Sequence, residues 1–480
     1  MRPEEVENLT LLSDYYEFTM GNGYHEAGYD DTIGYFDLYY RTVPDSGGFA
    51  IAAGLEQLIE YIQNLHFTEE DLTFLQEKGI FSDSFLDYLR NFQFSCDVWA
   101  MPEGTVVFPN EPLVVVRGPI IQAQLIETMA LLLINHQSLI ATKANRMVRA
   151  SEGRIVMEFG ARRAHGSSAA TLGARAAYIG GVAGSSNTLT DKRYGVPALG
   201  TMAHSWVQLF PTEYDAFHAY ASIYPDSCIL LVDTYDTLRS GIPNAIRVFD
   251  EVVTKKGFRP KGIRLDSGDI AYLSKEARKM LDEAGYADCP IAASSGLDEF
   301  IIRHLIQEGA EVDSFGVGER LITSRSNPVF GGVYKLVAVE QNGEYIPKIK
   351  ISANVEKITT PGFKNVIRIY DPNTNKARAD LLTEFHEEIP DNEPLEIFHP
   401  MFTWKRKTFH EFTLRKLLVP VFEKGKLVYD IPSIEQTREY CQQEVDSLWE
   451  EVKRFDNPHE YIVDLSISLW RIKDQLLHSM

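Results

Sequence analysis

Cysteine is scarce in this sequence, and its four residues are far apart. The 480-residue chain contains Cys96, Cys228, Cys289 and Cys441, without any Cys-x-x-Cys pair. This spacing excludes a zinc knuckle, and four thiols in a chain of this length do not form a disulfide scaffold. We therefore expect reduced cysteines and a cytoplasmic location.

Long hydrophobic runs are also missing. The longest, around 129–134, is far shorter than the roughly 20 residues that cross a bilayer. Segment 1–12 carries three glutamates and no apolar core preceded by positive charge, so it does not resemble a signal peptide. With 44% hydrophobic and 24% charged residues, the composition is that of a soluble globular protein without a membrane partner. The length predicts two or three domains.

Positive charge is in deficit. The chain has 47 Lys and Arg against 68 Asp and Glu, a formal net charge of −21. Nucleic-acid binding depends on clustered Lys and Arg, so a nucleic-acid partner is not expected. A local basic pocket for a small anion remains compatible with this balance.

Several common catalytic signatures are absent. Gly425-Lys426 lacks the first glycine and the following hydroxyl of a phosphate loop, and neither H-E-x-x-H nor G-x-S-x-G occurs. The twelve histidines show no metal-ligand spacing. Gly316-Val317-Gly318 is only the start of a dinucleotide fingerprint, since its third glycine is missing.

The first 150 residues mix strands and helices. Segments 33–40, 98–107 and 112–118 read as strands, 53–64 as an amphipathic helix and 120–151 as a helical stretch.

From about residue 154 the sequence pattern changes. Short apolar runs follow one another, and each ends in a cluster of small or polar residues. These runs are 154–159, 196–200, 228–232, 262–265, 290–293 and 313–315. The last three intervals between them are each about one β-α unit long. Parallel strands place their carboxyl ends on one rim, so the pattern predicts a β/α barrel with the polar clusters facing a common centre.

The remainder of the chain is predicted to return to the first domain. Segments 333–339 and 345–351 look like a hairpin, 366–370 adds a strand, and the chain from 433 onward is helical and charged. We therefore divide the chain into four parts. They are the N-terminal part of a flanking α/β domain (1–125), a catalytic barrel (126–330), strands that return to the flanking domain (331–400) and a mostly helical C-terminal segment (401–480).

Two of the polar clusters combine positive charge with small or acidic neighbours. Arg264-Leu-Asp266-Ser-Gly-Asp269 joins a guanidinium to two carboxylates, which suits an anion together with Mg²⁺ or hydroxyl groups. The alternative is an ion pair that closes a strand-helix turn. Arg162 and Arg163, among small residues, suit a carboxylate or phosphate, or else form a solvated basic loop.

Three further clusters leave alternatives open. Asp233-Thr-Tyr-Asp236 lacks the adjacent acids of a type I phosphoribosyltransferase motif, and an aspartate that caps the next helix is the simpler interpretation. His204 is an acid/base, a nucleophile for a phosphoryl group, or a histidine without a chemical role. Asp14-Tyr-Tyr-Glu17 either packs a helix or supplies a ring that stacks on a flat substrate.

Taken together and in order, these segments resemble the nicotinate phosphoribosyltransferase family over nearly the whole chain. The matching motifs are Ser13-Asp-Tyr-Tyr16, Phe159-Gly-Ala-Arg-Arg163, Gly184-Ser-Ser-Asn187, Gly200-Thr-Met-Ala-His-Ser205, Asp233-Thr-Tyr-Asp236, Arg264-Leu-Asp-Ser-Gly-Asp269 and Phe315-Gly-Val-Gly318.

The resemblance implies an irregular α/β barrel like that of quinolinate phosphoribosyltransferases, flanked by an α/β domain built from both ends of the chain. It implies a homodimer with sites at the interface. It also implies the reaction of nicotinate with phosphoribosyl diphosphate, driven by ATP through a phosphohistidine, with Mg²⁺ as cofactor.

The resemblance also implies roles for individual residues. His204 corresponds to the phosphorylated histidine, and with Asp266 and Arg264 it forms the expected catalytic set. Phe159 and Tyr16, the latter from the neighbouring subunit, correspond to the rings that sandwich the pyridine. The other expected nicotinate contacts are Arg162, Thr201 and Asn187. The expected phosphoribosyl diphosphate contacts are Arg264, Asp233, Asp266, Gly296, Gly316, Gly318 and Thr323, with Asp233 and Asp266 also expected to bind Mg²⁺.

Two rival functions are weighed against this one. Relatives that use nicotinamide carry an acid after the second barrel strand, where this chain has Ser186-Asn187, and an acid there would repel a carboxylate. Its absence favours nicotinate. The second rival is a catalytically silent sensor of pyridine nucleotides, which would not need His204, Asp266 and Arg264 together. One departure from the family pattern is Glu319-Arg320, where small or hydroxyl residues are expected near phosphate.

Overall fold

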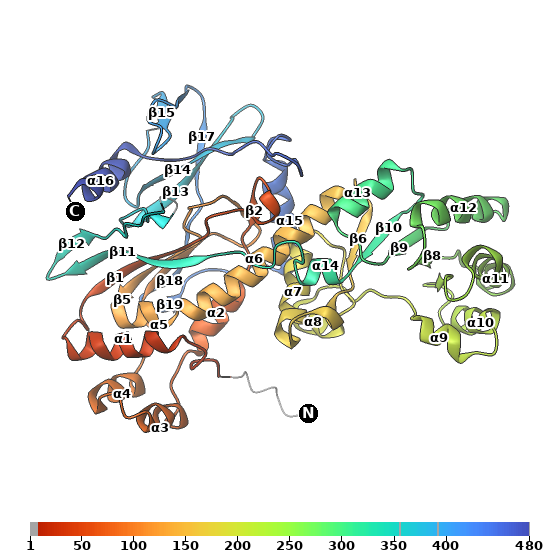
Figure 1. The fold of residues 1–480 in the computed structure, drawn as a ribbon, viewed down its shortest axis with the longest axis horizontal. Helices are drawn as coiled ribbons and strands as arrows, with labels where there is room; N and C mark the ends of the chain where they lie inside the picture. Colours follow the sequence, from red (N-terminus) through yellow and green to blue (C-terminus); the bar gives the residue numbers. More distant parts are fainter. Residues whose placement is uncertain (1–7, 355–356, 391–392, 480) are drawn as a thin grey trace. The chain divides into compact units, whose positions relative to one another are not determined.

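The computed structural model describes residues 8–354, 357–390 and 393–479. Residues 1–7, part of the segment weighed above as a signal peptide, lie outside the described residues. The chain forms two compact units (Figure 1). One, which we call the terminal unit, contains Met1–Leu139 and Val329–Met480, and the other, the barrel unit, contains Ile140–Pro328. A flanking domain built from both ends of the chain is therefore confirmed.

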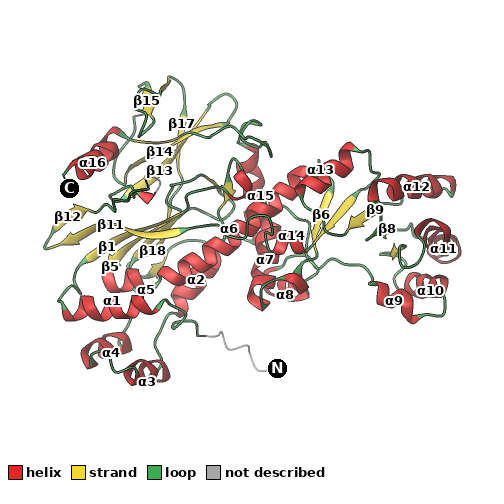
Figure 2. Ribbon diagram, viewed as in Figure 1, coloured by secondary structure: helices red, strands yellow, loops and turns green. Residues whose placement is uncertain are grey.

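The terminal unit is built around an antiparallel seven-stranded sheet. Its strands follow one another in the order β12 (Glu344–Pro347), β11 (Val333–Gln341), β1 (Ile33–Tyr39), β5 (Val114–Pro119), β3 (Asp97–Ala100), β18 (Val419–Glu423) and β19 (Lys426–Leu427). Helix α5 (Ile120–Leu125) packs on β1 and β5, and α1 (Tyr15–Glu26) packs on α5 (Figure 2). The central strand β1 is almost wholly buried, which explains its apolar and aromatic sequence.

A second sheet of this unit contains β17 (Thr413–Lys416), β13 (Lys364–Tyr370), β14 (Ala377–Glu384) and β20 (Val463–Leu465). At its centre Arg368 is fully buried and binds Asp380 at 2.6 Å and Glu444 at 3.1 Å. A buried charge is tolerated only when it is paired, so this cluster specifies how the sheet meets α15 (Ile434–Asp446).

The remaining elements of the terminal unit are short. Two further strand pairs are β2 (Ala50–Ile51) with β4 (Val106–Val107), and β15 (Leu395–Phe398) with β16 (Arg406–Phe409). The other helices are α2 (Leu55–Asn64), α3 (Glu69–Glu77), α4 (Asp83–Arg90) and α16 (Ile467–His478). A capping box between Thr68 and Asp71 starts α3 by satisfying backbone N–H groups that have no partner within the helix.

Five parallel strands form the sheet of the barrel unit. Their order is β6 (Ile155–Glu158), β10 (Ser314–Val317), β9 (Ile291–Ser294), β8 (Gly262–Leu265) and β7 (Ile229–Leu231). Single parallel bridges add Ser185 beside Glu158 and Ala198 beside Ser185. Beyond these two ends of the ladder, His204, after Ala198, contacts Asp233, after β7, at 3.2 Å. The predicted parallel β/α arrangement of this unit is confirmed.

Helices connect these strands and cover them. They are α7 (Ser167–Ile179), α8 (Thr188–Tyr194), α9 (His204–Leu209), α10 (Glu213–Ile223), α11 (Ile242–Val248), α12 (Ile270–Glu283), α13 (Glu299–Gln307) and α14 (Glu319–Ile322). Figure 1 shows β8, β9 and β10 one beside another with α12 and α13 on the outside. These alternating elements place the carboxyl ends of the strands on one rim.

Two sequence-based expectations are corrected by the structure. Segment 401–480 is not mostly helical, because residues 406–427 form β16 to β19. The predicted helical character holds for α15 and α16 after residue 433, whereas two of the strands before it pair with the distant strands β3 and β13. The first 120 residues contain α1, α3 and α4 besides the one expected helix over 53–64.

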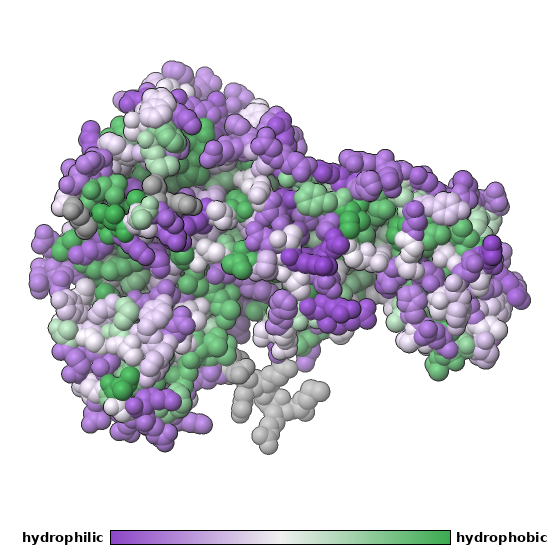
Figure 3. Space-filling view, in the orientation of Figure 1, coloured by the Kyte–Doolittle hydropathy of each residue, from purple (hydrophilic) through white to green (hydrophobic). Residues whose placement is uncertain are grey.

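The surface agrees with the charge balance of the sequence. Figure 3 shows hydrophilic residues over most of the visible face, with smaller hydrophobic areas between them. The helical run Ile120–Ala150, which includes α5 and α6 (Glu127–Ala150), is long and apolar enough to cross a membrane. However, 72% of its most apolar window is buried inside the protein, as in the core helix of a soluble protein.

Candidate active site

The rim of the barrel contains a cavity of about 310 Å³. The carboxyl ends of β6, β8, β9 and β10 and the loops that follow them supply its lining. Phe159, Arg264, Asp266, Gly296, Gly316 and Gly318 are among the lining residues. Together with Arg162, which also lines it, seven predicted residues from four segments of the sequence are brought together around one cavity.

The lining of this cavity is strongly cationic. It contains five arginines, at 162, 163, 264, 320 and 325, but only two carboxylates, Asp266 and Glu319. Asp266 is paired with Arg264 at 2.8 Å, and Glu319 with Arg325 at 3.2 Å. Arg162 and Arg163 are exposed, and their side chains form no hydrogen bond or ion pair with any described residue. In a protein of charge −21, such a cluster attracts a small polyanion to this place.

Arg264 is held in one orientation by three different neighbours. Its Nε donates to Ser294 Oγ at 2.9 Å, one Nη donates to Thr201 Oγ1 at 3.1 Å and the other to Asp266 Oδ1 at 2.8 Å. Ser294 Oγ also donates to Asp266 Oδ1. Because a guanidinium with three fixed partners has little rotational freedom, Arg264 is preorganised before any ligand binds.

An aromatic ring lies against Gly316 of β10. The Phe159 backbone N–H donates to Val317 O at 2.6 Å, and its ring covers Gly316 so closely that a Cβ there would lie 2.6 Å from Phe159 Cδ2. The Arg264 guanidinium carbon is 5.7 Å from the centre of the ring. A flat ligand on Phe159 would thus have a cation next to it.

The loop after β9 has an unusual backbone conformation. Ser295 and Gly296 both have positive φ, at 107° and 59°. Positive φ is easily adopted by glycine but costs energy at serine, and such strained turns gather at ligand sites. Near Gly318 the backbones are also close, since a Cβ there would lie 3.3 Å from Phe159 O. Loops of this kind can present N–H groups to a phosphate.

His204 and Asp233 form a pair beside the arginine network. Asp233 Oδ1 lies 3.2 Å from His204 Nε2, and Oδ2 accepts hydrogen bonds from Asp266 N at 2.8 Å and Ser267 Oγ at 2.6 Å. The Asp233 side chain is 2% exposed and that of His204 38% exposed. Since a carboxylate only accepts, Nε2 is the nitrogen that carries the proton in this contact.

The structure does not bring every predicted residue to the cavity. Asn187 caps α8, its side-chain oxygen accepting from Leu189 N, and Thr323 Oγ1 donates to Glu319 O at 2.7 Å. Neither residue lines the cavity. Tyr16 belongs to α1 of the terminal unit, so the cavity is described here without it.

Three family models match the chain. They describe the N-terminal domain of nicotinate phosphoribosyltransferase over residues 11–135, the family as a whole over 155–380, and its C-terminal domain over 363–473. The nicotinate phosphoribosyltransferase of Bacillus subtilis is 46% identical over 474 residues, which cover 99% of this chain and 96% of that protein. The chain belongs to the nicotinate phosphoribosyltransferase family.

Solved structures agree with this family membership. The crystal structure of human nicotinic acid phosphoribosyltransferase superposes with a TM-score of 0.85 and 30% identity, covering 97% of this chain and 100% of that one. A nicotinate-nucleotide pyrophosphorylase from Pyrococcus furiosus has a TM-score of 0.71 at 24% identity and covers 93% of this chain and 97% of its own. The second likeness shows the shared fold.

Two carboxylates of the site, Asp233 and Asp266, are the candidate ligands for Mg²⁺, and their surroundings show which of them could bind it. Asp233 has both oxygens in contact with protein groups and is almost unexposed, so it does not fit a metal ligand. Asp266 is 31% exposed, and its Oδ2 contacts no donor among the described residues. Within that described part of the chain, no group of three His, Cys, Asp or Glu could hold a metal. Asp266 therefore fits as a single ligand, since Mg²⁺ usually binds one or two carboxylates together with phosphates and water.

The sequence analysis did not identify several residues that line the barrel cavity. Ser294, Ser295 and Arg325 were not singled out, and Arg320 was noted only as a departure from the pattern. Arg320 donates to Asp298 Oδ2 of the loop after β9. The available signal for Arg320 was its place two residues after a glycine that follows a strand, as in Gly160-Ala-Arg162 and Gly318-Glu-Arg320.

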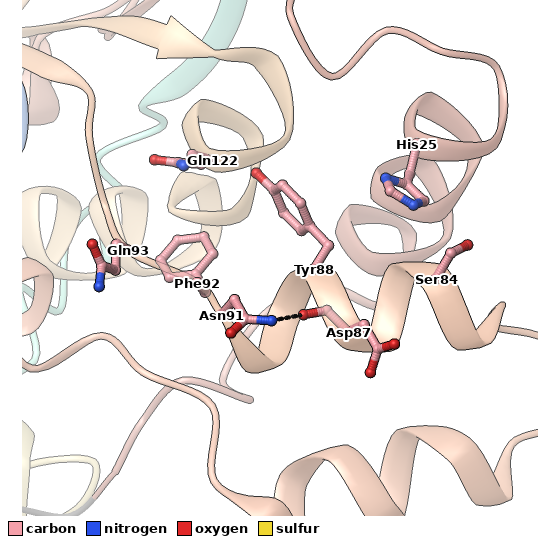
Figure 4. Close-up of a pocket in the computed structure, with 8 residues that line it drawn as sticks. All are labelled: His25, Ser84, Asp87, Tyr88, Asn91, Phe92, Gln93 and Gln122. Atoms are coloured by element: carbon pink, nitrogen blue, oxygen red, sulfur yellow. Dashed lines mark hydrogen bonds between the residues drawn. The ribbon is translucent and has the colours of Figure 1, made fainter.

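The terminal unit contains a pocket of its own, of about 420 Å³, between α1, α4 and α5 (Figure 4). Figure 4 shows the Tyr88 ring pointing toward the Gln122 carboxamide, with His25 on the opposite side. Its one carboxylate, Asp87, is paired with Arg90. Because the lining has no lysine, arginine or glycine, it offers no phosphate site, and the barrel cavity remains the candidate active site.

Proposed function

We propose that this protein joins nicotinate to phosphoribosyl diphosphate, forming nicotinate mononucleotide and diphosphate, and that hydrolysis of ATP through a phosphohistidine drives the reaction. The observation that carries the proposal is the arrangement of Phe159, a cationic cavity and the His204–Asp233 pair on one barrel rim. We include a cytoplasmic location, in keeping with the four buried free thiols, and a role in the salvage of pyridine for NAD biosynthesis.

Nicotinate is a planar carboxylate, and the cavity offers a ring and cations for it. Its pyridine would stack on Phe159, while its carboxylate would be met by Arg162 and by Arg264, which Thr201 orients. In the proposed homodimer, Tyr16 of the partner subunit would cover the second face of the pyridine. A carboxylate between two guanidinium groups explains a preference for nicotinate over nicotinamide.

The phosphoribosyl donor carries its charge at two ends. We assign its 5′-phosphate to the backbone around Gly296, Gly316 and Gly318 and its ribose hydroxyls to Asp266, which leaves the diphosphate toward the remaining arginines. Mg²⁺, when bound with the diphosphate and Asp266, would neutralise charge on the leaving group. In the roles proposed for them, Asn187 would donate from the amide nitrogen that its helix cap leaves unused, and Thr323 would exchange its hydrogen bond to Glu319 O.

In the transfer step the pyridine nitrogen forms a bond to C1 of the ribose as the bond from C1 to the diphosphate oxygen breaks. Positive charge develops on the ribose ring during this exchange. The Asp266 carboxylate stabilises that charge, and the arginines stabilise the departing diphosphate. Preorganisation matters because Arg264 and Asp266 are already bound to each other and to Ser294.

In the ATP-dependent step, Nδ1 of His204 attacks the γ-phosphorus of ATP. An N–P bond forms, the bond from that phosphorus to the β,γ-bridging oxygen breaks, and ADP leaves. Nε2 keeps its proton, and Asp233, which accepts the hydrogen bond from Nε2–H, stabilises the positive charge that develops on the ring. Water later takes the phosphoryl group and restores His204.

The test measures diphosphate release with Mg²⁺ and phosphoribosyl diphosphate, with nicotinate or nicotinamide, in the presence and absence of ATP. We expect release with nicotinate, an increase with ATP, and loss of that increase in His204→Ala. Radiolabel from γ-labelled ATP should remain on the wild-type protein and be absent from the variant.

Other outcomes would replace the proposal. Release with nicotinamide alone would move the protein to the sister activity, and no release with either would favour a nucleotide sensor. A homodimer is tested separately by light scattering, with Tyr16→Ala expected to raise the KM for nicotinate.

A further inference from the structure

Glu158, the last residue of β6, is a buried carboxylate that the proposed mechanism does not use. It is 0% exposed. Its Oε1 accepts the backbone N–H of Gly160, and its Oε2 accepts the Ser185 hydroxyl at 2.6 Å. No Lys, Arg or His among the described residues is paired with it, and burial raises its pKa. A buried carboxyl without a cation is unfavourable, so its retention calls for a physical reason.

Two single bridges connect β6 to the segment that leads to His204, Glu158 to Ser185 and Ser185 to Ala198. Backbone hydrogen bonds span both bridges, among them Glu158 N to Gly184 O at 3.0 Å, Ser186 N to Glu158 O at 2.9 Å and Ser185 N to Pro197 O at 3.0 Å. The carboxyl of Glu158 adds a side-chain hydrogen bond to this part of the ladder.

Ser185 extends this connection to the next loop. Its Oγ accepts the backbone N–H of Asn187 at 3.0 Å while it donates to Glu158. One hydroxyl thus couples the end of β6 to the loop that starts α8. An alanine at 185 would leave one buried acceptor and one backbone donor without partners.

The backbone at Gly160 is closely surrounded by other atoms. A Cβ there would lie 2.7 Å from Glu158 Oε1 and 2.7 Å from Gly318 O. The Glu158 carboxyl and Gly318 O therefore leave no room for a side chain at position 160. Phe159 and Arg162, the proposed nicotinate contacts, lie one residue before and two residues after Gly160.

We propose that Glu158 is a positioning residue for nicotinate. Its carboxyl fixes the Phe159–Arg162 turn relative to the segment that precedes His204. It acts through these residues and does not touch the substrate. The inference rests on the proposed function. The expected effect is larger on nicotinate than on phosphoribosyl diphosphate, because Asp266, assigned to the donor ribose, and its partner Ser294 have no hydrogen bond to Glu158.

The test compares Glu158→Ala, Glu158→Gln and Ser185→Ala in the intact protein. For Glu158→Ala we expect the KM for nicotinate to rise about tenfold or more, with the KM for phosphoribosyl diphosphate changed less than about twofold. Glu158→Gln should lie between this variant and wild type. Its carboxamide keeps one acceptor but turns N–H groups toward a donor.

Two control variants in the same unit measure the effect of losing a buried hydrogen bond outside the cavity. Glu213 is 4% exposed and accepts from Asn244 Nδ2 at 3.0 Å, and Ser274 is 0% exposed and accepts from Glu311 N at 3.1 Å. Glu213→Gln and Ser274→Ala should lower Tm and leave the ratio of the two KM values unchanged.

The proposal is overturned if Glu158→Ala and Ser185→Ala lower Tm like the controls without changing that ratio. Should wild type show no turnover with nicotinate, the proposed function fails, and amide hydrogen exchange then decides the positioning role. Faster exchange at Gly160 and Asn187 in Glu158→Gln, at a temperature where global unfolding is slow, would support it. Unchanged exchange would refute it.

Discussion

Replacing Gly316 by alanine tests how closely the cavity depends on the position of one ring. The added Cβ would lie 2.6 Å from Phe159 Cδ2, 2.7 Å from Cε2 and 3.3 Å from Ser294 Cβ. Carbon atoms in contact are normally about 3.5–4.0 Å apart, so the ring must retreat by about 1 Å. A displacement of this size costs about 100-fold in rate, and the forced packing about 1–3 kcal/mol of stability.

The assay is diphosphate release under varied nicotinate and varied phosphoribosyl diphosphate, together with urea unfolding. We expect kcat/KM for nicotinate to fall about 100-fold in Gly316→Ala, equivalent to about 2.7 kcal/mol of transition-state stabilisation. Gly23→Ala is the matched control, since its Cβ would meet nothing within 4 Å in α1. A kcat/KM for Gly316→Ala within about threefold of wild type would refute the role of Phe159.

Three further changes test the site and its surroundings. Arg264→Lys cannot keep three directed hydrogen bonds, so kcat/KM for nicotinate should fall about 10- to 100-fold; an unchanged value contradicts the guanidinium role. Asp233→Asn should reduce radiolabelling of His204 by ATP while leaving the ATP-independent rate measurable, and full labelling would argue against the pair. Burial raises the pKa of Glu17 to about 7 in the folded protein. The protonated carboxyl therefore contributes to the free energy of unfolding fully at pH values below the ordinary glutamate pKa, and this contribution is lost as pH rises through 7. Glu17→Gln should remove up to about 3 kcal/mol of that pH dependence in urea unfolding, and parallel curves for both proteins would exclude it.

Elements with a strong local pattern could be predicted from the sequence. The amphipathic helix over 53–64 and the short runs at 262–265 and 290–293 appear as α2, β8 and β9. Such strands are buried on both faces, so their sequences are continuously apolar and end abruptly where the rim begins. The strands within segment 406–427 were not predicted, because they are stabilised by distant partner strands rather than by a pattern of their own.

The composition and order of motifs in the sequence, by themselves, determined the family, the barrel and most residues of the cavity. They did so because strand ends in a parallel barrel meet at one rim whatever the distance along the chain. Tertiary structure alone decided which groups share a hydrogen bond. It paired Asp233 with His204 and used both of its oxygens, assigned Asn187 to a helix cap, and placed the uncompensated carboxyl of Glu158 beneath Gly160. Those contacts depend on distances below 3.5 Å between segments far apart in sequence, which no local pattern specifies.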